Sequence, residues 1–274
     1  MLARRLFRSA PFVVGAALVL FMVVVSIAAP MLSSYEPLRM SPADRLQPPS
    51  AEHPFGTDQL GRDVMTRVMY GGRLSLPMGV APIAVAALAG LILGLISGFY
   101  GRWVDLVLMR IVDVWIAFPP ILLALAVVTI LGTGLTNIMI ALGIAWIPYY
   151  ARMVRGSVLE AKQRVYVDAA RALGGLDLRI ILRHVLPNVM TPIMVMSSMG
   201  VANAILAGAA LSFLGLGAQA PAPEWGTSLA DARQFIRLGW WVGLFPGLAI
   251  AVTVLGANLM GDGLRDALDP KLKL

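Results

Sequence analysis

Long stretches without a charged residue dominate this chain. Five of them are long enough to cross a membrane, and they cover residues 9–35, 74–101, 114–151, 185–223 and 238–261. A helix needs about 20 consecutive apolar residues to span a bilayer, because its backbone polar groups must bond to one another there. The stretches are continuously apolar and do not alternate with polar residues, which is typical of helices. The pattern therefore predicts an all-α integral membrane protein.

The third stretch is too long for one span, and Gly132-Thr133-Gly134 divides it into two. We therefore expect six transmembrane helices in a single domain that comprises residues 1–274. The predicted helix cores are 11–31, 77–99, 104–131, 135–151, 189–213 and 240–260. The apolar part of the first is longer than the roughly 7–15 residues of a signal peptide, so we expect an uncleaved helix.

Composition agrees with this class of protein. Hydrophobic residues make up 58% of the chain and charged residues only 14%, whereas about a quarter of the residues in soluble domains are charged. Cysteine is absent, so the chain can form neither a disulfide nor a thiolate site.

The formal net charge of +7 could suggest nucleic-acid binding, but the distribution of the charges indicates membrane topology instead. Segment 152–183 carries seven Arg and Lys residues against three acids, and Arg4, Arg5 and Arg8 precede the first helix. Segment 33–73 is balanced, with five Arg and five acids. Basic residues mark the cytoplasmic side of a membrane. We therefore expect both termini and residues 152–188 in the cytoplasm, residues 33–73 and 215–238 outside, and no nucleic-acid partner.

The external segment 33–73 begins with several prolines, which favour irregular backbone. We predict that Thr57 then caps a short helix over residues 58–70 and that Gly71-Gly72 ends it. This helix could lie on the outer membrane surface or form part of a docking surface for an external partner.

The charged insert 152–188 is predicted to form two helices with a sharp bend. Residues 158–173 favour helix, Gly174-Gly175 stops it, and Asp177 can cap a second short helix through His184. One face of this second helix is apolar, with Leu178, Ile181 and Leu182. An apolar face of this kind could fill a groove on a partner protein, or it could lie flat on anionic lipid.

The same insert resembles the "EAA" loop of ABC-importer permeases. Asp168-Ala169-Ala170, three residues, Gly174, nine residues and then His184-x-Leu186-Pro187 match the spacing of that motif at every element. Asp168 replaces the usual Glu and keeps its charge, whereas His184 replaces an apolar Ile. The resemblance implies a six-helix type I permease whose short helix couples the membrane domain to an ATPase.

Further segments resemble the second, C-type permease of dipeptide, oligopeptide and nickel importers. The matching segments are 53–64, 72–75, 211–217, 223–226 and 261–270. This resemblance implies a second (B-type) permease subunit, two ATP-binding subunits and an external solute-binding protein in a bacterial or archaeal cytoplasmic membrane. Di- or oligopeptides are the expected solutes, with nickel, a nickel chelate or glutathione as alternatives.

The chain itself lacks the means to hydrolyse ATP. A phosphate-binding loop of the form G-x4-G-K-[ST] needs a lysine in a glycine-rich setting, and the only lysines are Lys162, Lys271 and Lys273, none of which has that setting. We therefore expect no enzymatic activity and no cofactor here, with ATP and Mg²⁺ bound by partner subunits. A self-sufficient secondary transporter or channel would need internal repeats and broken helices with intramembrane ion ligands, which the sequence does not show, and it would not need the insert. A membrane enzyme is less consistent still, because the sequence shows no nucleophile–base or metal constellation.

Candidate residues for a translocation path fall on two predicted spans. Arg110 and Asp113 are ionisable residues of the third span, where a functional role competes with a structural i,i+3 ion pair. Met196, Met199 and Asn203 share one stripe of the fifth span, where Met can equally serve to fill packing gaps. The two histidines are expected on opposite sides of the membrane, so no metal site is predicted.

Overall fold

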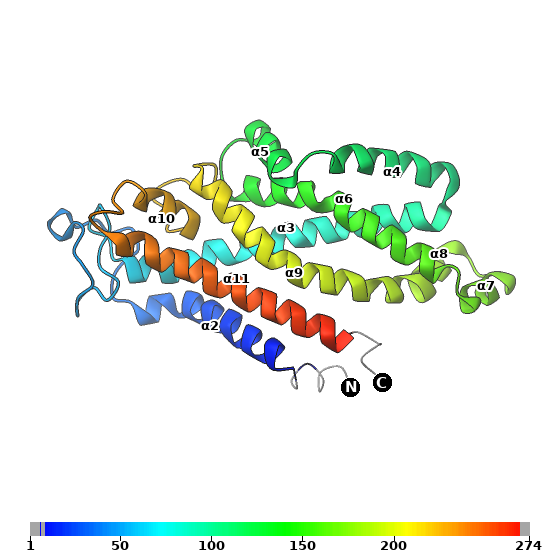
Figure 1. Ribbon diagram of the computed structural model, residues 1–274, viewed down its shortest axis with the longest axis horizontal. Helices are drawn as coiled ribbons and strands as arrows, with labels where there is room; N and C mark the ends of the chain where they lie inside the picture. The colour runs from blue at the N-terminus through cyan, green and yellow to red at the C-terminus, as the bar shows by residue number, and fades with distance from the viewer. Residues whose placement is uncertain (1–5, 7–8, 269–274) are drawn as a thin grey trace.

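A computed structural model describes residue 6 and residues 9–268. Arg4, Arg5, Arg8, the last residues of the 261–270 segment, Lys271 and Lys273 lie outside the described residues. Most of the longer helices run side by side along the molecule (Figure 1). The bounds of the helices are α2 Ala10–Leu32, α3 Val64–Tyr100, α4 Arg102–Ile116, α5 Pro120–Leu131, α6 Leu135–Ala161, α9 Leu186–Phe213 and α11 Trp240–Leu268.

Shorter elements occupy the two ends of this bundle. At one end, here called the α10 end, lie α10 (Trp225–Ala232) and the segment between α2 and α3, which contains the 3₁₀ helix η1 (Pro42–Asp44) (Figure 1). At the other, the α7 end, lie α7 (Val165–Ala172), α8 (Asp177–Ile180) and the π-helical turn η2 (Ile181–Val185).

Five helices are long and apolar enough to cross a membrane, and a sixth span results if α4 and α5 are counted together. The predicted core 104–131 is thus not one straight helix, because α4 and α5 meet at an angle of 90°. The bend coincides with Pro119-Pro120, of which Pro120 is the first residue of α5. Proline lacks a backbone N–H, and it disfavours helical conformation in the residue before it, so the pair interrupts the helix.

The prediction for residues 58–72 was wrong. Asp63, and not Thr57, is the N-cap of α3, and its carboxylate accepts a hydrogen bond of 2.7 Å from the backbone N–H of Thr66. Gly71 and Gly72 do not end a helix but lie inside the 37-residue α3. A Cβ on Gly71 would lie 2.3 Å from the carbonyl oxygen of Pro223, so these glycines serve close packing.

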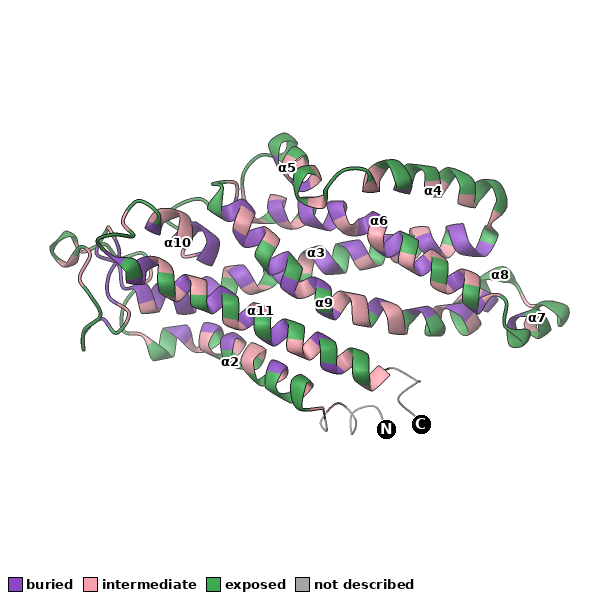
Figure 2. Ribbon diagram, viewed as in Figure 1, coloured by how far each residue is buried: buried purple, intermediate pink, exposed green. Residues whose placement is uncertain are grey.

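The buried residues lie mainly between α3, α6, α9 and α11, whereas the outer helix faces are exposed (Figure 2). α3 and α6 approach closely because Gly90 and Gly94 of α3 face Tyr150 and Val154 of α6. Large apolar side chains such as Phe21 and Ile27 of α2 remain on the outer surface. Such faces suit lipid chains, which are as apolar as the side chains themselves.

Candidate functional site

The insert differs from its prediction in detail. α6 continues to Ala161, beyond the predicted core, and α7 is a separate helix of eight residues. Gly174 has φ +76°, so the bend lies where it was predicted, and the N–H of Gly175 closes it on the carbonyl of Ala170 (3.0 Å). Asp177 is not the N-cap, since Leu176 occupies that position and no side chain caps the helix.

The second helix of the insert does not end at His184, where it was predicted to end. α8, η2 and α9 follow one another without a break, and Pro187 lies in the first turn of α9, where its missing N–H costs little. The short helix of the insert is therefore the first part of a long helix that extends through the bundle.

Four leucines form an exposed apolar surface at the α7 end. Leu178 is 67% exposed and Leu182 is 54% exposed, and they lie one helical turn apart. We call this the leucine surface, and its members are Leu173, Leu176, Leu178 and Leu182. Ile181, which we expected on the same face, instead packs against the buried cluster that contains Val158 and Ile180.

The other motif residues surround this surface without forming one pocket. Asp168, Ala169 and Pro187 are exposed, and Ala170 and Leu186 are partly buried. His184 is partly buried as well, and its ring centroid lies 6.2 Å from that of Tyr166.

Polar contacts attach the insert firmly to the bundle. The Lys162 ammonium donates to the carbonyl oxygens of Gly98 and Phe99 at 3.1 and 3.2 Å, which are the last carbonyls of α3. A cation is favourable there, because the free carbonyls of a helix C-terminus carry partial negative charge. The Arg171 guanidinium lies 5.7 Å from the centroid of the Phe99 ring. These contacts attach the insert to the C-terminal end of α3.

A groove within the bundle contains three of the predicted path residues. Met196, Met199 and Asn203 line one side of a cavity of about 360 Å³, as their spacing along α9 predicted. The remaining wall comes from Pro120, Trp146, Tyr149, Tyr150 and Gly200. Gly200 belongs to α9 itself, but the contribution of the other four depends on how α5 and α6 pack against α9, which no local pattern indicates. We call this cavity the α6–α9 groove.

Arg110 and Asp113 do not form the predicted ion pair. Asp113 instead accepts a hydrogen bond from Arg152 of α6 at 2.5 Å, and Asp105 pairs with Arg155 of the same helix. Arg110 is exposed and lines, with Asp105, Asp113 and Arg155 among others, a cavity of about 410 Å³. Packing of α4 on α6 supplies partners that are better placed than those within α4.

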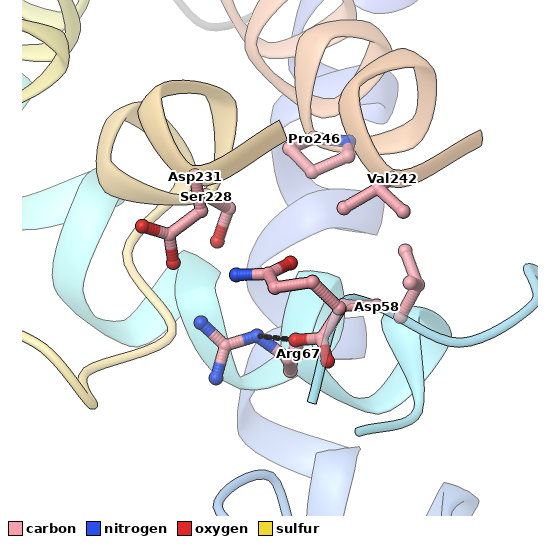
Figure 3. A pocket seen from close by; sticks show the side chains of 8 residues that line it. Asp58, Arg67, Ser228, Asp231, Val242 and Pro246 are labelled. Carbon is pink, nitrogen blue, oxygen red and sulfur yellow. Dashed lines mark ion pairs between the residues drawn. The ribbon is translucent and has the colours of Figure 1, made fainter. Parts of the chain in front are cut away.

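Charged side chains of the α2–α3 segment and the start of α3 lie against α10, and all of them except Asp231 are buried (Figure 3). Asp58 accepts from Arg62 Nε at 2.6 Å and lies 3.6 Å from Arg67 Nε, and Arg62 lies 3.7 Å from Asp231 of α10. Burial raises the pKa of the Asp231 carboxyl above its ordinary value. We call Asp58, Arg62, Arg67 and Asp231 the outer ion network.

The second anchor of α10 is Glu224, which is fully buried at its N-terminus. Its carboxylate accepts from the backbone N–H groups of Gly226 and Thr227 at 2.7 and 2.8 Å, and from the Ser75 hydroxyl of α3 at 3.0 Å. Beside it the Trp225 indole donates to the carbonyl of Val68 (2.8 Å). The 223–226 segment thus connects α10 to α3 through these hydrogen bonds.

The histidines belong to opposite ends of the bundle. His53 lies in the segment before α3, where its Nδ1 is 3.0 Å from Asp63, and His184 lies in η2. Among the described residues no three His, Cys, Asp or Glu side chains are grouped as metal ligands would be.

Comparison with known proteins identifies the family. Residues 90–274 match the family described as binding-protein-dependent transport system inner membrane component, and residues 1–49 match the N-terminal transmembrane domain of oligopeptide transport permease C. The chain is 50% identical, over 95% of its length and 86% of the relative's, to a dipeptide transport system permease protein of Alkalihalophilus pseudofirmus. It is 46% identical, over 98% of its length and 90% of the relative's, to a glutathione transport system permease protein of Pectobacterium atrosepticum.

A solved structure shows the same fold. The methionine ABC transporter MetNI in an inward-facing conformation matches with a TM-score of 0.61 at 18% identity, over 75% of this chain and 98% of that one. The type I permease fold predicted from the motif is thereby confirmed. The family also implies ATPase partners and a further permease subunit. The chain belongs to the binding-protein-dependent transport family and is a membrane-spanning permease subunit of an ABC importer, not an enzyme.

Proposed function

We propose that this subunit imports di- or oligopeptides. The observation that supports the proposal is the 50% identity to a dipeptide permease along nearly the whole chain. Glutathione is the second candidate, because a glutathione permease is 46% identical over a similar length. Glutathione is itself a small peptide, so both solutes have charged ends and an amide backbone. Nickel, which the sequence left open, is less favoured, since the described residues offer no cluster of metal ligands.

The proposed complex contains a B-type permease, two ATP-binding subunits and an external solute-binding protein in a bacterial cytoplasmic membrane. Both chain termini and residues 152–188 face the cytoplasm in this proposal. The leucine surface then contacts an ATP-binding subunit, with the Asp168-Ala169-Ala170 segment and the Gly174 bend holding it in place. No cofactor is assigned to this chain.

Solute uptake tests the substrate. Proteoliposomes that contain the complex with its binding protein are expected to accumulate a labelled dipeptide when ATP is supplied, and not when ATP is replaced by a non-hydrolysable analogue. Labelled glutathione and ⁶³Ni²⁺ serve as competing solutes in parallel assays. ATP-driven nickel accumulation without peptide accumulation would show that the peptide assignment is wrong.

Labelling from outside the cell tests the orientation. Single cysteines are clean probes because the chain has none, and Glu36 and Arg179 are both exposed. We expect a membrane-impermeant maleimide to label Glu36→Cys in intact cells and to label Arg179→Cys only after the cells are opened. The opposite pattern would place the insert outside the cell.

A further inference from the structure

Two ion pairs join α4 to α6, and they differ in the number of hydrogen bonds that each makes. Arg155 holds Asp105 with two hydrogen bonds of 2.5 Å, and Ser97 adds a third at 2.6 Å. Arg152 reaches Asp113 through a single contact of 2.5 Å, and neither side chain makes another hydrogen bond to a described residue. The Arg155–Asp105 pair is therefore the more fully bonded of the two.

The Arg152–Asp113 pair is open to its surroundings. The two side chains are 52% and 51% exposed, and Arg152 lies where α6 passes into the segment 152–188 that is proposed to face the cytoplasm. Arg110, on the same helix as Asp113, is exposed as well. Charges in a span cannot face the hydrocarbon of the bilayer without a large cost in free energy. This side of α4 and α6 must therefore face water or protein.

The pair lies beside the α6–α9 groove. Tyr149 of the groove precedes Arg152 by three residues, so the two side chains are neighbours on one face of α6. Asp113 is held next to Arg152 by their hydrogen bond, and it also lines the cavity of about 410 Å³. The pair thus lies next to the α6–α9 groove, on its α7 side, without lining it.

We propose that the Arg152–Asp113 pair and the α6–α9 groove together form a contact site for a zwitterionic peptide in transit. Arg152 binds the carboxylate terminus, Asp113 binds the ammonium terminus, and Trp146, Tyr149, Met196 and Met199 contact the side chains. This inference rests on the proposed peptide function and names the residues that would meet the peptide.

Charge and size support this occupant. A peptide with two charged ends replaces the one contact between Arg152 and Asp113 by two contacts, so neither protein charge is left without a partner. An extended dipeptide is about 7 Å long, a span that the long Arg152 side chain can open by turning away from the shorter Asp113. The groove volume of about 360 Å³ lies in the range of small-ligand sites. Flexible thioether and aromatic surfaces accept side chains of varied shape.

Protection of a cysteine measures this contact directly. Met199→Cys places one thiol in the groove of a chain without other cysteines, and its reaction with maleimide is followed by mass spectrometry of this subunit. The complex is used without its solute-binding protein, so that any discrimination arises in the membrane subunits. The probes are dialanine, which has both terminal charges, N-acetyl-dialanine, which lacks the ammonium, and dialanine amide, which lacks the carboxylate.

Each substitution is expected to weaken binding of only the peptides that carry the terminal charge it contacts. Arg152→Gln raises the concentration of dialanine or N-acetyl-dialanine needed for half-protection about tenfold, but does not change that of dialanine amide. Asp113→Asn has the same effect on dialanine and its amide, but not on N-acetyl-dialanine. Arg237→Gln, an exposed cation at the α10 end, is the control and changes none of the three.

Two outcomes would overturn the proposal. Equal effects of both substitutions on all three compounds would show that the pair only supports the fold, and absence of protection by any peptide would exclude the groove as a contact site. Peptide uptake by the unmodified complex is measured on the same preparation after the solute-binding protein has been added. If uptake is normal, only this inference fails, whereas absent uptake means that the proposed function itself is wrong.

Discussion

Replacement of Leu178 by Asp is expected to detach the ATP-binding subunits while the permease remains folded. The side chain is 67% exposed and lies in the leucine surface, so nothing inside the permease depends on it. In the complex, a buried leucine contributes about 1.5–3 kcal/mol of apolar transfer free energy, and a buried carboxylate without a partner costs more. Affinity purification through a tag on this subunit, followed by quantification of the co-purified ATP-binding subunit, measures the effect.

Arg179→Ala is the matched control on the same short helix. A solvated charge contributes only about 0–1 kcal/mol, so this variant should retain the ATP-binding subunits. If the leucine surface instead lies on anionic lipid, basic residues matter more. Loss of the ATP-binding subunits should then appear in Arg179→Ala and increase with salt. If Leu178→Asp retains the ATP-binding subunits and Arg179→Ala loses them, the lipid alternative is supported. Ile181 is unsuitable for this test because it packs against the core.

Replacement of Glu224 by Ala is expected to loosen the α10 end of the bundle. The change removes the cap of α10 and leaves buried N–H groups of Gly226 and Thr227 without an acceptor. Loss of the cap and of these bonds should lower the free energy of unfolding by about 2–5 kcal/mol. Thermal unfolding of the purified complex, and the rate of proteolysis in the segment before α3, report the loss.

Asp231→Asn provides the contrast, because it also removes a carboxylate from α10. Since burial raises the pKa of Asp231 in the folded protein, the folded state holds its proton more tightly than the unfolded chain does. The resulting stability is present below the ordinary carboxyl pKa and is lost as the pH rises through the raised pKa. At neutral pH the ionised Asp231 carboxylate does not add this stability. Asp231→Asn should therefore unfold at the same temperature as the unmodified protein or at a higher one. A loss equal to that in Glu224→Ala would contradict this account.

The spans were predictable because hydrophobicity is a local property of the sequence. The cores 11–31, 189–213 and 240–260 lie within α2, α9 and α11. The bend between α4 and α5 could have been found from Pro119-Pro120, but the charge-free stretch continues through it and conceals it.

Glycine was harder to interpret than proline. Gly174 was correctly assigned to a left-handed bend, whereas Gly71 and Gly72 were mistaken for the end of a helix. The two uses differ only in what approaches the residue: open space surrounds Gly174, while Ser26 and Trp225 lie against Gly72. Long-range packing decides between them, and a single sequence does not contain it.

Side-chain partners were the least predictable feature. The spacing of Arg110 and Asp113 indicated a pair within one helix, but Asp113 meets Arg152, which is 39 residues further along the chain. The stripe of Met196, Met199 and Asn203 was visible from helical spacing, yet the aromatic wall opposite was not. Contacts within a helix follow from its period, and contacts between helices do not.

The continuity of α8, η2 and α9 has a mechanical consequence. Residues Asp177–Phe213 form one helical rod, so Leu178 of the leucine surface and Asn203 of the groove lie on one body, about 38 Å apart along its axis. A tilt of about 5° about one end displaces the other by about 3 Å, which is close to the width of a peptide backbone. The nucleotide-driven movement of an attached subunit would thus widen or narrow the groove directly, as a lever does, with no intermediate part to transmit it.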